Sequence, residues 1–127
     1  MKSIYWGIFV QDERLVPTLE RPIQYMHVTF GFKSKVPTDI LGETVEVSVI
    51  GYANDGKNEA YLVEVPEKYA PYVTNPRKRI LHITTSISSS ARPVDSNNLN
   101  FEPIDKPFTV TGRFGFYGDD KVIHYVQ

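Results

Sequence analysis

The sequence lacks cysteine altogether, and it has one tryptophan, two methionines and three histidines among 127 residues. The absence of cysteine excludes disulfide frameworks, thiolate zinc sites and cysteine nucleophiles, and it is typical of a reducing compartment. Net charge is almost absent too, at −1 from 14 Lys+Arg and 15 Asp+Glu. A large surface that grips a nucleic-acid backbone by bulk positive charge is therefore not expected.

Long hydrophobic runs are also missing. The apolar stretch nearest the N-terminus, Ile4–Val10, is shorter than a signal-peptide core and has no small-residue cleavage site after it. No stretch approaches the roughly 18 apolar residues of a membrane-spanning helix. We therefore expect a cytoplasmic protein (in the host cytoplasm, if the source is viral) with no membrane partner.

The residues that are present suffice for one hydrophobic core, since 41% are hydrophobic and 13% aromatic. Helix is predicted only over Asp12–Tyr25 and Glu67–Val73, with a short turn at Asp95–Leu99. Alternating or continuous apolar residues rich in β-branched and aromatic types predict strands instead. These strands are Ser3–Gln11, Met26–Phe32, Glu43–Ile50, Ala60–Val65, Leu81–Ile87, Phe108–Phe116 and Lys121–Val126. The fold class is α+β with strands dominating.

A short internal repeat suggests two related halves. Gly51–Lys57, with its Asn-Asp-Gly hairpin turn, matches Gly115–Lys121 at an offset of 64 residues. A strand precedes each hairpin, and a segment containing histidine precedes each strand. Each half thus has the order histidine strand, loop, hairpin. We predict a single bilobal domain over residues 1–127, with pseudo-two-fold halves at about 21–66 and 78–127 packed face to face.

The two histidine segments share the pattern His–x–Thr, at His27 to Thr29 and His82 to Thr84. Residues two apart in a strand point to the same side. In each segment the polar row can face a cleft while the alternate apolar row enters the core. A pseudo-two-fold axis would then bring the two polar rows opposite each other.

Two histidines and two threonines in one cleft suit the cleavage of a phosphodiester. One neutral imidazole can take a proton from the attacking oxygen, and one imidazolium can give a proton to the leaving oxygen. The hydroxyls of Thr29 and Thr84 can donate to the non-bridging phosphate oxygens, where charge accumulates. We therefore predict His27 and His82 as the catalytic acid and base, in an order that the residues leave open.

The distribution of charge favours an anionic ligand at the histidines. The windows between Glu20 and Asp39 and between Glu67 and Asp95 hold 8 of the 14 basic residues and no acidic residue. Each window contains one His–x–Thr segment. Lys33, Ser86 and Arg92 are the further candidates for binding substrate, whereas Arg77–Arg79 could equally be a solvated loop.

Other chemistries have little support. The histidine windows contain no carboxylate, so a metal centre is not expected, and no cofactor is predicted. His124 is predicted to be a structural or exposed residue rather than a third metal ligand. There is no Walker loop, no dinucleotide-binding glycine motif and no Gly-x-Ser-x-Gly elbow.

The chain resembles the two-histidine (2H) phosphoesterase superfamily, whose signature is a pair of His–x–Thr/Ser motifs on a bilobal, pseudo-symmetric α+β fold. The segments HVTFGFK, with its downstream Lys33, and HITTSISSSARPVDSNNL are similar to those of the cyclic phosphodiesterase domain of plant and fungal tRNA ligases. The resemblance implies His27 and His82 as the acid/base pair, Thr29 and Thr84 as phosphate holders, and no metal requirement.

We therefore expect a metal-independent enzyme that hydrolyses a 2′,3′-cyclic phosphate, on a nucleotide or an RNA end, or a related cyclic nucleotide. The superfamily also includes phage proteins that destroy cyclic nucleotide immune signals, so cleavage of cyclic oligonucleotide messengers is the alternative within this class. A non-catalytic module that binds such a nucleotide is the alternative from another class.

Overall fold

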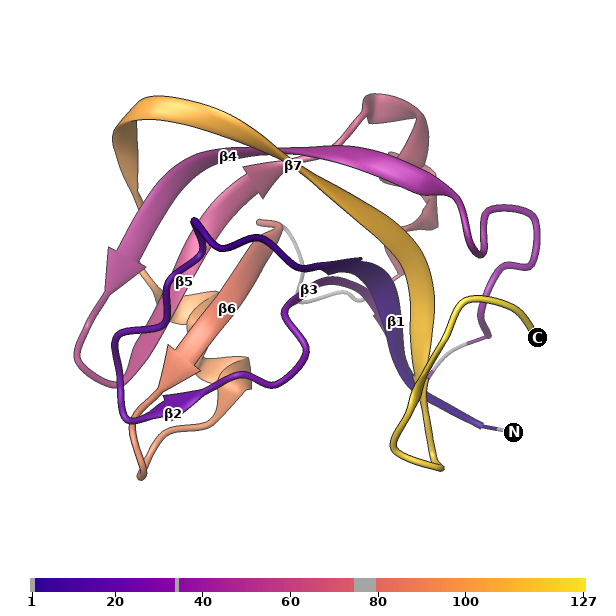
Figure 1. The fold of residues 1–127 in the computed structure, drawn as a ribbon, viewed down its shortest axis with the longest axis horizontal. Coiled ribbons are helices and arrows are strands. Elements are labelled where there is room, and N and C mark those ends of the chain that lie inside the picture. The colour runs from indigo at the N-terminus through magenta and orange to yellow at the C-terminus, as the bar shows by residue number, and fades with distance from the viewer. Residues whose placement is uncertain (1, 34, 75–79) are drawn as a thin grey trace.

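A computed structural model describes residues 2–33, 35–74 and 80–127, and its strands form one antiparallel sheet that closes into a six-stranded barrel (Figure 1). The order around the barrel is β1 (Ser3–Val10), β3 (His27–Phe32), β6 (His82–Ile87), β5 (Asn58–Glu64), β4 (Thr44–Asn54) and β7 (Glu102–Gly118). The barrel is closed because β7 also pairs with β1.

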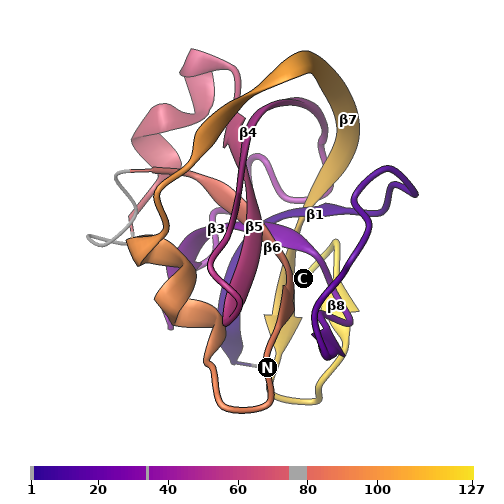
Figure 2. The same cartoon turned by 90° about the vertical axis from the view of Figure 1, so that its left-hand side faces the viewer.

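Four short elements lie outside the barrel strands. β2 (Arg21–Pro22) pairs with β6, and β8 (Ile123–His124) pairs with β7. The two helical elements are single 3₁₀ segments, η1 (Glu67–Tyr72) and η2 (Pro93–Asn98). Figure 2 shows η2 beside β5 and β6. None of the described helices is long and apolar enough to cross a membrane.

The core fills the barrel because alternate side chains of each strand point inward. In β4, for example, Val45, Val47 and Val49 are buried while the residues between them are exposed. Trp6, Phe30 and Phe114 are the largest side chains at the centre, and η1 adds Tyr69. A smaller apolar cluster lies under η2 on the outer face and contains Ala53, Ala60, Leu99 and Phe101.

The predicted strands are confirmed, with one shorter than expected. The hairpin turn between β4 and β5 has Gly56 at φ +83°, a conformation that glycine adopts without strain. The helical turns at 67–73 and 95–99 are confirmed as η1 and η2. The last predicted strand, Lys121–Val126, is reduced to Ile123–His124.

The strand pairing has a two-fold relation that passes through the centre of the barrel. β3 pairs with β6 at Val28 and Ile83, and β4 pairs with β7 at Val47 and Val110. All four side chains are almost fully buried. If β3 is exchanged with β6, β4 with β7 and β1 with β5, the order of the strands around the barrel stays the same. The pairing register of both β1 and β5 also shifts at the equivalent point, between Trp6 and Gly7 and between Glu59 and Ala60, where β3 and β6 each have one extra residue.

This relation changes the boundaries of the predicted halves. The two-fold relation superimposes Val47 of β4 on Val110 of β7, which is an offset of 63 residues. The hairpin sequences instead match at an offset of 64. Applied to these strands, that offset would superimpose buried residues on exposed ones. The second half is completed by the N-terminal strand β1, whereas β8 pairs only at the end of β7. Both halves contribute strands to one continuous sheet, and β3 lies beside β6 in it.

The prediction of a helix over Asp12–Tyr25 is wrong. This segment crosses the outside of the barrel as an extended strap that contains β2, and Pro17 and Pro22 remove two of the backbone donors that a helix would need. The guanidinium of Arg21 donates to the carbonyls of Ser88 and Ala91. The strap is thus fixed along β6 and the loop after it.

The carboxylate of Glu59 holds the middle of the strap. Glu59 is fully buried in β5, and its two oxygens accept hydrogen bonds from the Thr18 amide (2.9 Å) and the Thr18 hydroxyl (2.6 Å). The hydroxyls of Tyr52, Thr85 and Ser86 also donate to it. Burial raises the pKa of Glu59, but these hydrogen bonds outweigh burial and lower it from 4.5 to about 2.

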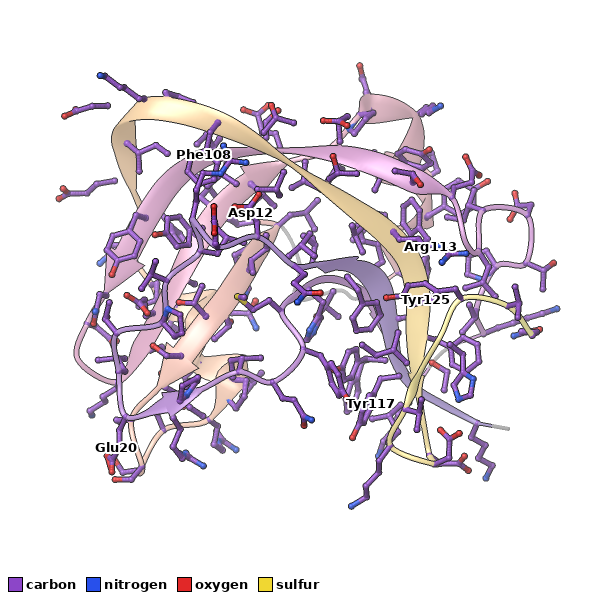
Figure 3. The ribbon with its side chains drawn as sticks, in the orientation of Figure 1. Asp12, Glu20, Phe108, Arg113, Tyr117 and Tyr125 are labelled. Carbon is purple, nitrogen blue, oxygen red and sulfur yellow. The ribbon has the colours of Figure 1, made fainter. Side chains whose placement is uncertain are left out.

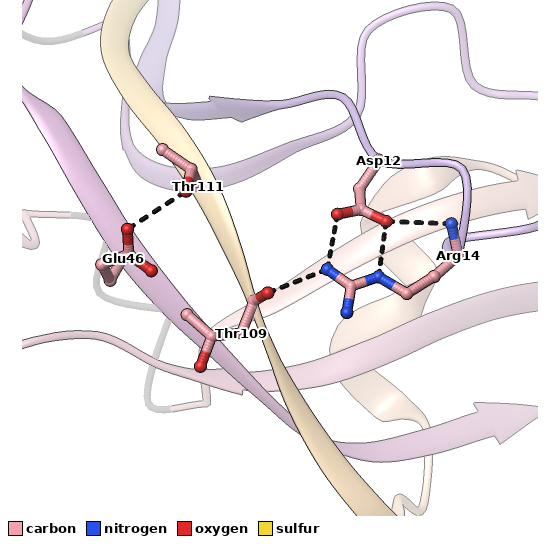
Figure 4. Close-up of polar contacts among 5 residues, drawn as sticks. All are labelled: Asp12, Arg14, Glu46, Thr109 and Thr111. Atoms are coloured by element: carbon pink, nitrogen blue, oxygen red, sulfur yellow. Dashed lines mark hydrogen bonds and ion pairs between the residues drawn. The ribbon is translucent and has the colours of Figure 1, made fainter.

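A second set of contacts fixes the first turn of the strap to β7. Asp12 binds Arg14 through two hydrogen bonds to the guanidinium, and Arg14 also donates to the Thr109 carbonyl at 2.9 Å (Figure 4). On the same exposed face, the Thr111 hydroxyl donates to Glu46 of β4. The strap is therefore attached at both β5 and β7.

We predict that Glu59→Gln destabilises the protein at neutral pH by about 2 kcal/mol or more, because an amide presents N–H groups to a site full of donors. The pH dependence has a fixed sign. The folded pKa lies below the ordinary value, so the carboxylate contributes of order 3 kcal/mol above pH 4.5 and loses that contribution as the pH falls through about 2.

Urea unfolding between pH 2 and 7 tests this prediction, with Glu64→Gln at the exposed end of the same strand as the control. The wild-type and Glu64→Gln proteins should lose stability together towards low pH, and Glu59→Gln should show a weaker dependence. Equal pH dependence in all three proteins would contradict the assigned role of Glu59.

Candidate functional site

The register of β3 and β6 brings the two His–x–Thr segments together on the outer face of the barrel. Val28 is paired with Ile83, so His27 lies across from Thr84 and Thr29 lies across from His82. Directly opposite residues are about 5 Å apart in an antiparallel pair, and diagonal ones such as the two histidines about 7–8 Å. The predicted quartet is thus assembled side by side in one sheet rather than across a cleft between lobes.

Both imidazoles make the same contact with the backbone. The Nδ1 atom of His27 lies 2.8 Å from the carbonyl oxygen of Tyr25, and the Nδ1 atom of His82 lies 3.3 Å from that of Ile80. In each case the carbonyl is two residues earlier in the chain. A carbonyl oxygen can only accept, so Nδ1 carries the proton in both neutral rings. The lone pair of each neutral imidazole therefore lies on Nε2.

The surroundings of the two histidines differ. His27 is partly exposed, and its ring is stacked on Tyr5 with centroids 4.3 Å apart and planes at 18°. Phe9 is a second, tilted neighbour at 5.5 Å. His82 is only 5% exposed, and its ring lies 6.1 Å from that of Phe101. His27 is thus flanked by the rings of Tyr5 and Phe9, the aromatic wall of β1, whereas His82 lies under the segment that follows η2.

The two threonines also differ. Thr29 lies across from Gly7 of β1, where a Cβ atom would meet the Val28 carbonyl oxygen at 1.9 Å. Only glycine permits this approach of β1 to β3. Thr84 donates a hydrogen bond of 2.9 Å to Ser96 of η2, which is fully buried. The Asn58 amide donates to the same Ser96 hydroxyl and to the Arg92 carbonyl.

The other predicted binding residues lie in different places. Lys33 follows β3 directly, is exposed, and has its ammonium 5.5 Å from the centroid of the Phe32 ring. Ser86 is buried, where it accepts from the Leu19 amide and donates to Glu59, so it is part of the strap attachment. Arg92 is exposed at the start of η2 and lies 3.6 Å from Asp95. The structure brings together the histidine–threonine quartet but not these three residues.

Arg77–Arg79 lie outside the described residues. His124 lies beside Phe116 in a stacked arrangement and 2.8 Å from a carboxylate oxygen of Asp120. It is thus part of the β7–β8 turn, away from the two histidine strands in the pairing. Within the described chain, no cluster of three or more histidine or carboxylate side chains could hold a metal ion.

One hollow in the described surface is separate from the quartet. Its volume is about 260 Å³, and it lies between the β4–β5 turn and the end of η2. Its lining residues are Ala53, Asn54, Asp55, Asn98, Leu99 and Asn100. None of the predicted site residues lines this hollow.

Sequence reasoning missed two groups that shape this site. Tyr5 was visible only as one aromatic residue in an apolar strand, and its contact with His27 depends on the pairing of β1 with β3. Glu59 follows a turn in a strand that reads as half exposed, and no local signal shows that a distant strap will bury it.

No protein-family model matches the chain, and no curated protein matches it either.

We predict that the neutral forms of His27 and His82 carry their proton on Nδ1, because each Nδ1 faces a backbone carbonyl. Two-bond ¹H–¹⁵N correlation spectra of the ¹⁵N-labelled protein above neutral pH would identify the tautomer of each ring. His124, whose Nε2 faces Asp120, should have its proton on Nε2 and is the internal control. Nε2–H tautomers at both His27 and His82 would contradict the geometry.

Proposed function

We propose that the protein is a metal-independent phosphodiesterase that hydrolyses a 2′,3′-cyclic phosphate or a related cyclic nucleotide by two-histidine acid/base catalysis. The observation that carries the proposal is the repeated geometry of His27 and His82. The two residues are on adjacent strands and on the same face, and each has Nδ1 directed at the carbonyl two residues before it.

The reaction needs one proton acceptor and one proton donor on opposite sides of phosphorus. Nε2 of one neutral histidine takes a proton from water as the water oxygen bonds to phosphorus. The bond from phosphorus to a ribose oxygen breaks, and that oxygen receives a proton from Nε2 of the other, protonated histidine. The first histidine is then charged and the second neutral, and exchange of protons with solvent restores both.

Thr29 and Thr84 have the role of donors to the non-bridging oxygens in this proposal. Each lies directly across from the histidine of the other motif, so one hydroxyl accompanies each imidazole. Thr84 would change its hydrogen-bond partner from Ser96 to the phosphate. The exposed Lys33 contributes positive charge at the end of the same strand.

The proposal also includes the family to which the fold belongs. A closed barrel in which β3 exchanges with β6, and β4 with β7, agrees with the pseudo-symmetry of the 2H phosphoesterase superfamily. We propose that this chain is a compact member in which the N-terminal strand completes the second half. The match of the two-fold axis to the two His–x–Thr segments supports this assignment.

We predict metal-independent turnover when the protein is incubated with EDTA and a panel of phosphodiesters. The panel contains 2′,3′-cyclic nucleotides, RNA ends bearing a cyclic phosphate, and cyclic di- and trinucleotides, with products followed by ³¹P NMR. His27→Ala and His82→Ala should each lower kcat by about 100-fold or more. His124→Ala is the matched control and should leave kcat within about twofold of the wild-type value.

Preference for the cyclic di- or trinucleotides over the 2′,3′-cyclic substrates would support the variant of the proposal in which the protein degrades cyclic oligonucleotide messengers. Loss of all turnover in EDTA would overturn the two-histidine mechanism. So would full activity in His27→Ala or His82→Ala.

A non-catalytic nucleotide-binding module is the second candidate, and two observations favour it. His82 is almost fully buried, and the Thr84 hydroxyl already has a partner in Ser96. For this function, isothermal titration would show binding of an unchanged cyclic nucleotide, with little change in His82→Ala.

A further inference from the structure

Three tyrosines and a histidine form an aromatic cluster on the outer face of β7, β1 and β3. Tyr117, Tyr5 and His27 come from three neighbouring strands, and their rings are nearly parallel from one to the next. The centroids are 5.1 Å apart for the two tyrosines, with planes at 13°. The Tyr25 ring is a tilted neighbour of Tyr117, with centroids 6.0 Å apart. Figure 3 places Tyr117 where β1 and β7 run together.

This stack differs from the aromatic contacts inside the barrel because it lies outside the core. The core rings Trp6, Phe30 and Phe114 meet at steep angles and are fully buried. Tyr5 and Tyr117 are instead partly exposed. The Tyr5 ring is stacked with both His27 and Tyr117, and the Phe9 ring lies 5.9 Å from it as well.

We propose that Tyr5 is a positioning residue for His27, and that Tyr117 supports Tyr5 from the adjacent strand. The proposal rests on the proposed function of His27 in the two-histidine reaction. The carbonyl of Tyr25 fixes the Nδ1 edge of the imidazole, and the Tyr5 ring covers one of its faces. Together they restrict both rotation of the ring and its tilt, so that Nε2 keeps one direction.

The aromatic ring also suits an imidazole that changes charge. The face of an aromatic ring carries negative electrostatic potential, so it stabilises a cation placed over it. Burial and the neighbouring Tyr117 and Tyr25 raise the pKa of Tyr5 to about 12. The phenol therefore stays neutral through the neutral pH range, and the ring face that His27 meets does not change as the imidazole gains or loses its proton.

The equivalent position beside His82 has no such ring. The two-fold relation of the barrel maps β1 onto β5 and Tyr5 onto Asn58, which donates to Ser96 and the Arg92 carbonyl. The aromatic wall is therefore specific to His27. Its removal should affect one histidine and leave the other in place.

The test compares Tyr5→Leu, which removes the ring, with Tyr5→Phe, which keeps it. With the cyclic phosphodiester that the wild-type protein cleaves, Tyr5→Leu should lower kcat about 100-fold with KM changed less than threefold, because a misplaced catalytic group loses rate more than binding. Tyr5→Phe should restore kcat to within about threefold. Tyr125→Leu, which removes a ring of the same surface that contacts Phe9 and Arg113 (Figure 3), should leave kcat unchanged.

A second readout does not depend on activity. The proton shifts of the His27 ring should move upfield from the Tyr5 ring current, remain there in Tyr5→Phe, and return towards free-imidazole values in Tyr5→Leu, while those of His82 stay constant. Tyr117→Leu should produce a smaller change in the same direction. Thermal unfolding of each variant shows whether it folds. If Tyr5→Leu does not fold, the His27 shifts of Tyr5→Phe and Tyr117→Leu are compared with those of the wild-type protein instead.

Three results would overturn the proposal. These are unchanged His27 shifts in folded Tyr5→Leu, full activity in that variant, or loss of activity in Tyr5→Phe equal to that in Tyr5→Leu, which would make the phenol hydroxyl the important group. If the wild-type protein cleaves none of the phosphodiesters, the proposed function fails, and the His27 shifts alone then decide whether Tyr5 positions the ring.

Discussion

The pairing of Val28 with Ile83 is the interaction on which the barrel and the candidate site both depend. It joins β3 to β6, and without it the sheet would be open at that point. Its inner side places two fully buried aliphatic side chains in the core, which opposes separation of the strands. Its outer side places each histidine across from the other motif's threonine. A one-residue slip would turn the apolar pair outward and the histidines inward, so the packing of the core fixes the register of the site.

The strap extends this constraint to the backbone around His27. Glu59 holds Thr18, Arg21 binds the loop after β6, and the Ile23 amide donates to the Thr85 carbonyl. Two residues later the chain reaches Tyr25, whose carbonyl faces Nδ1 of His27. A buried carboxylate far along the sequence therefore fixes the direction from which the imidazole is held. The cost of burying that charge is offset by donors from three different segments, which are the strap itself, β4 and β6.

The sequence predicts the local structure well and the assembly less well. Alternation in Val45–Val49 and the Asn-Asp-Gly turn identify β4, its inward face and its hairpin, because these depend on neighbours in the chain. Closure of the barrel depends on β1 pairing with two distant strands, and no local pattern shows which strands those are. The same limit applies to the site: the alternation places His27 and Thr29 on one face, but the aromatic wall of Tyr5 and the diversion of Ser86 to Glu59 arise from contacts between segments far apart in sequence.

The two halves of the barrel have equivalent strand pairing, but the side chains beside their histidines differ. The two-fold relation gives His27 and His82 equivalent positions in the strand pairing and the same Nδ1 contact, so each ring presents Nε2 in an equivalent way. The strands that flank them differ, since β1 offers the tyrosine ring where β5 offers Asn58 and Leu62. A reaction that needs one proton acceptor and one donor uses two identical side chains best when their surroundings are unlike. For the proposed two-histidine reaction, symmetry of the backbone with asymmetry of the flanking side chains would meet that requirement.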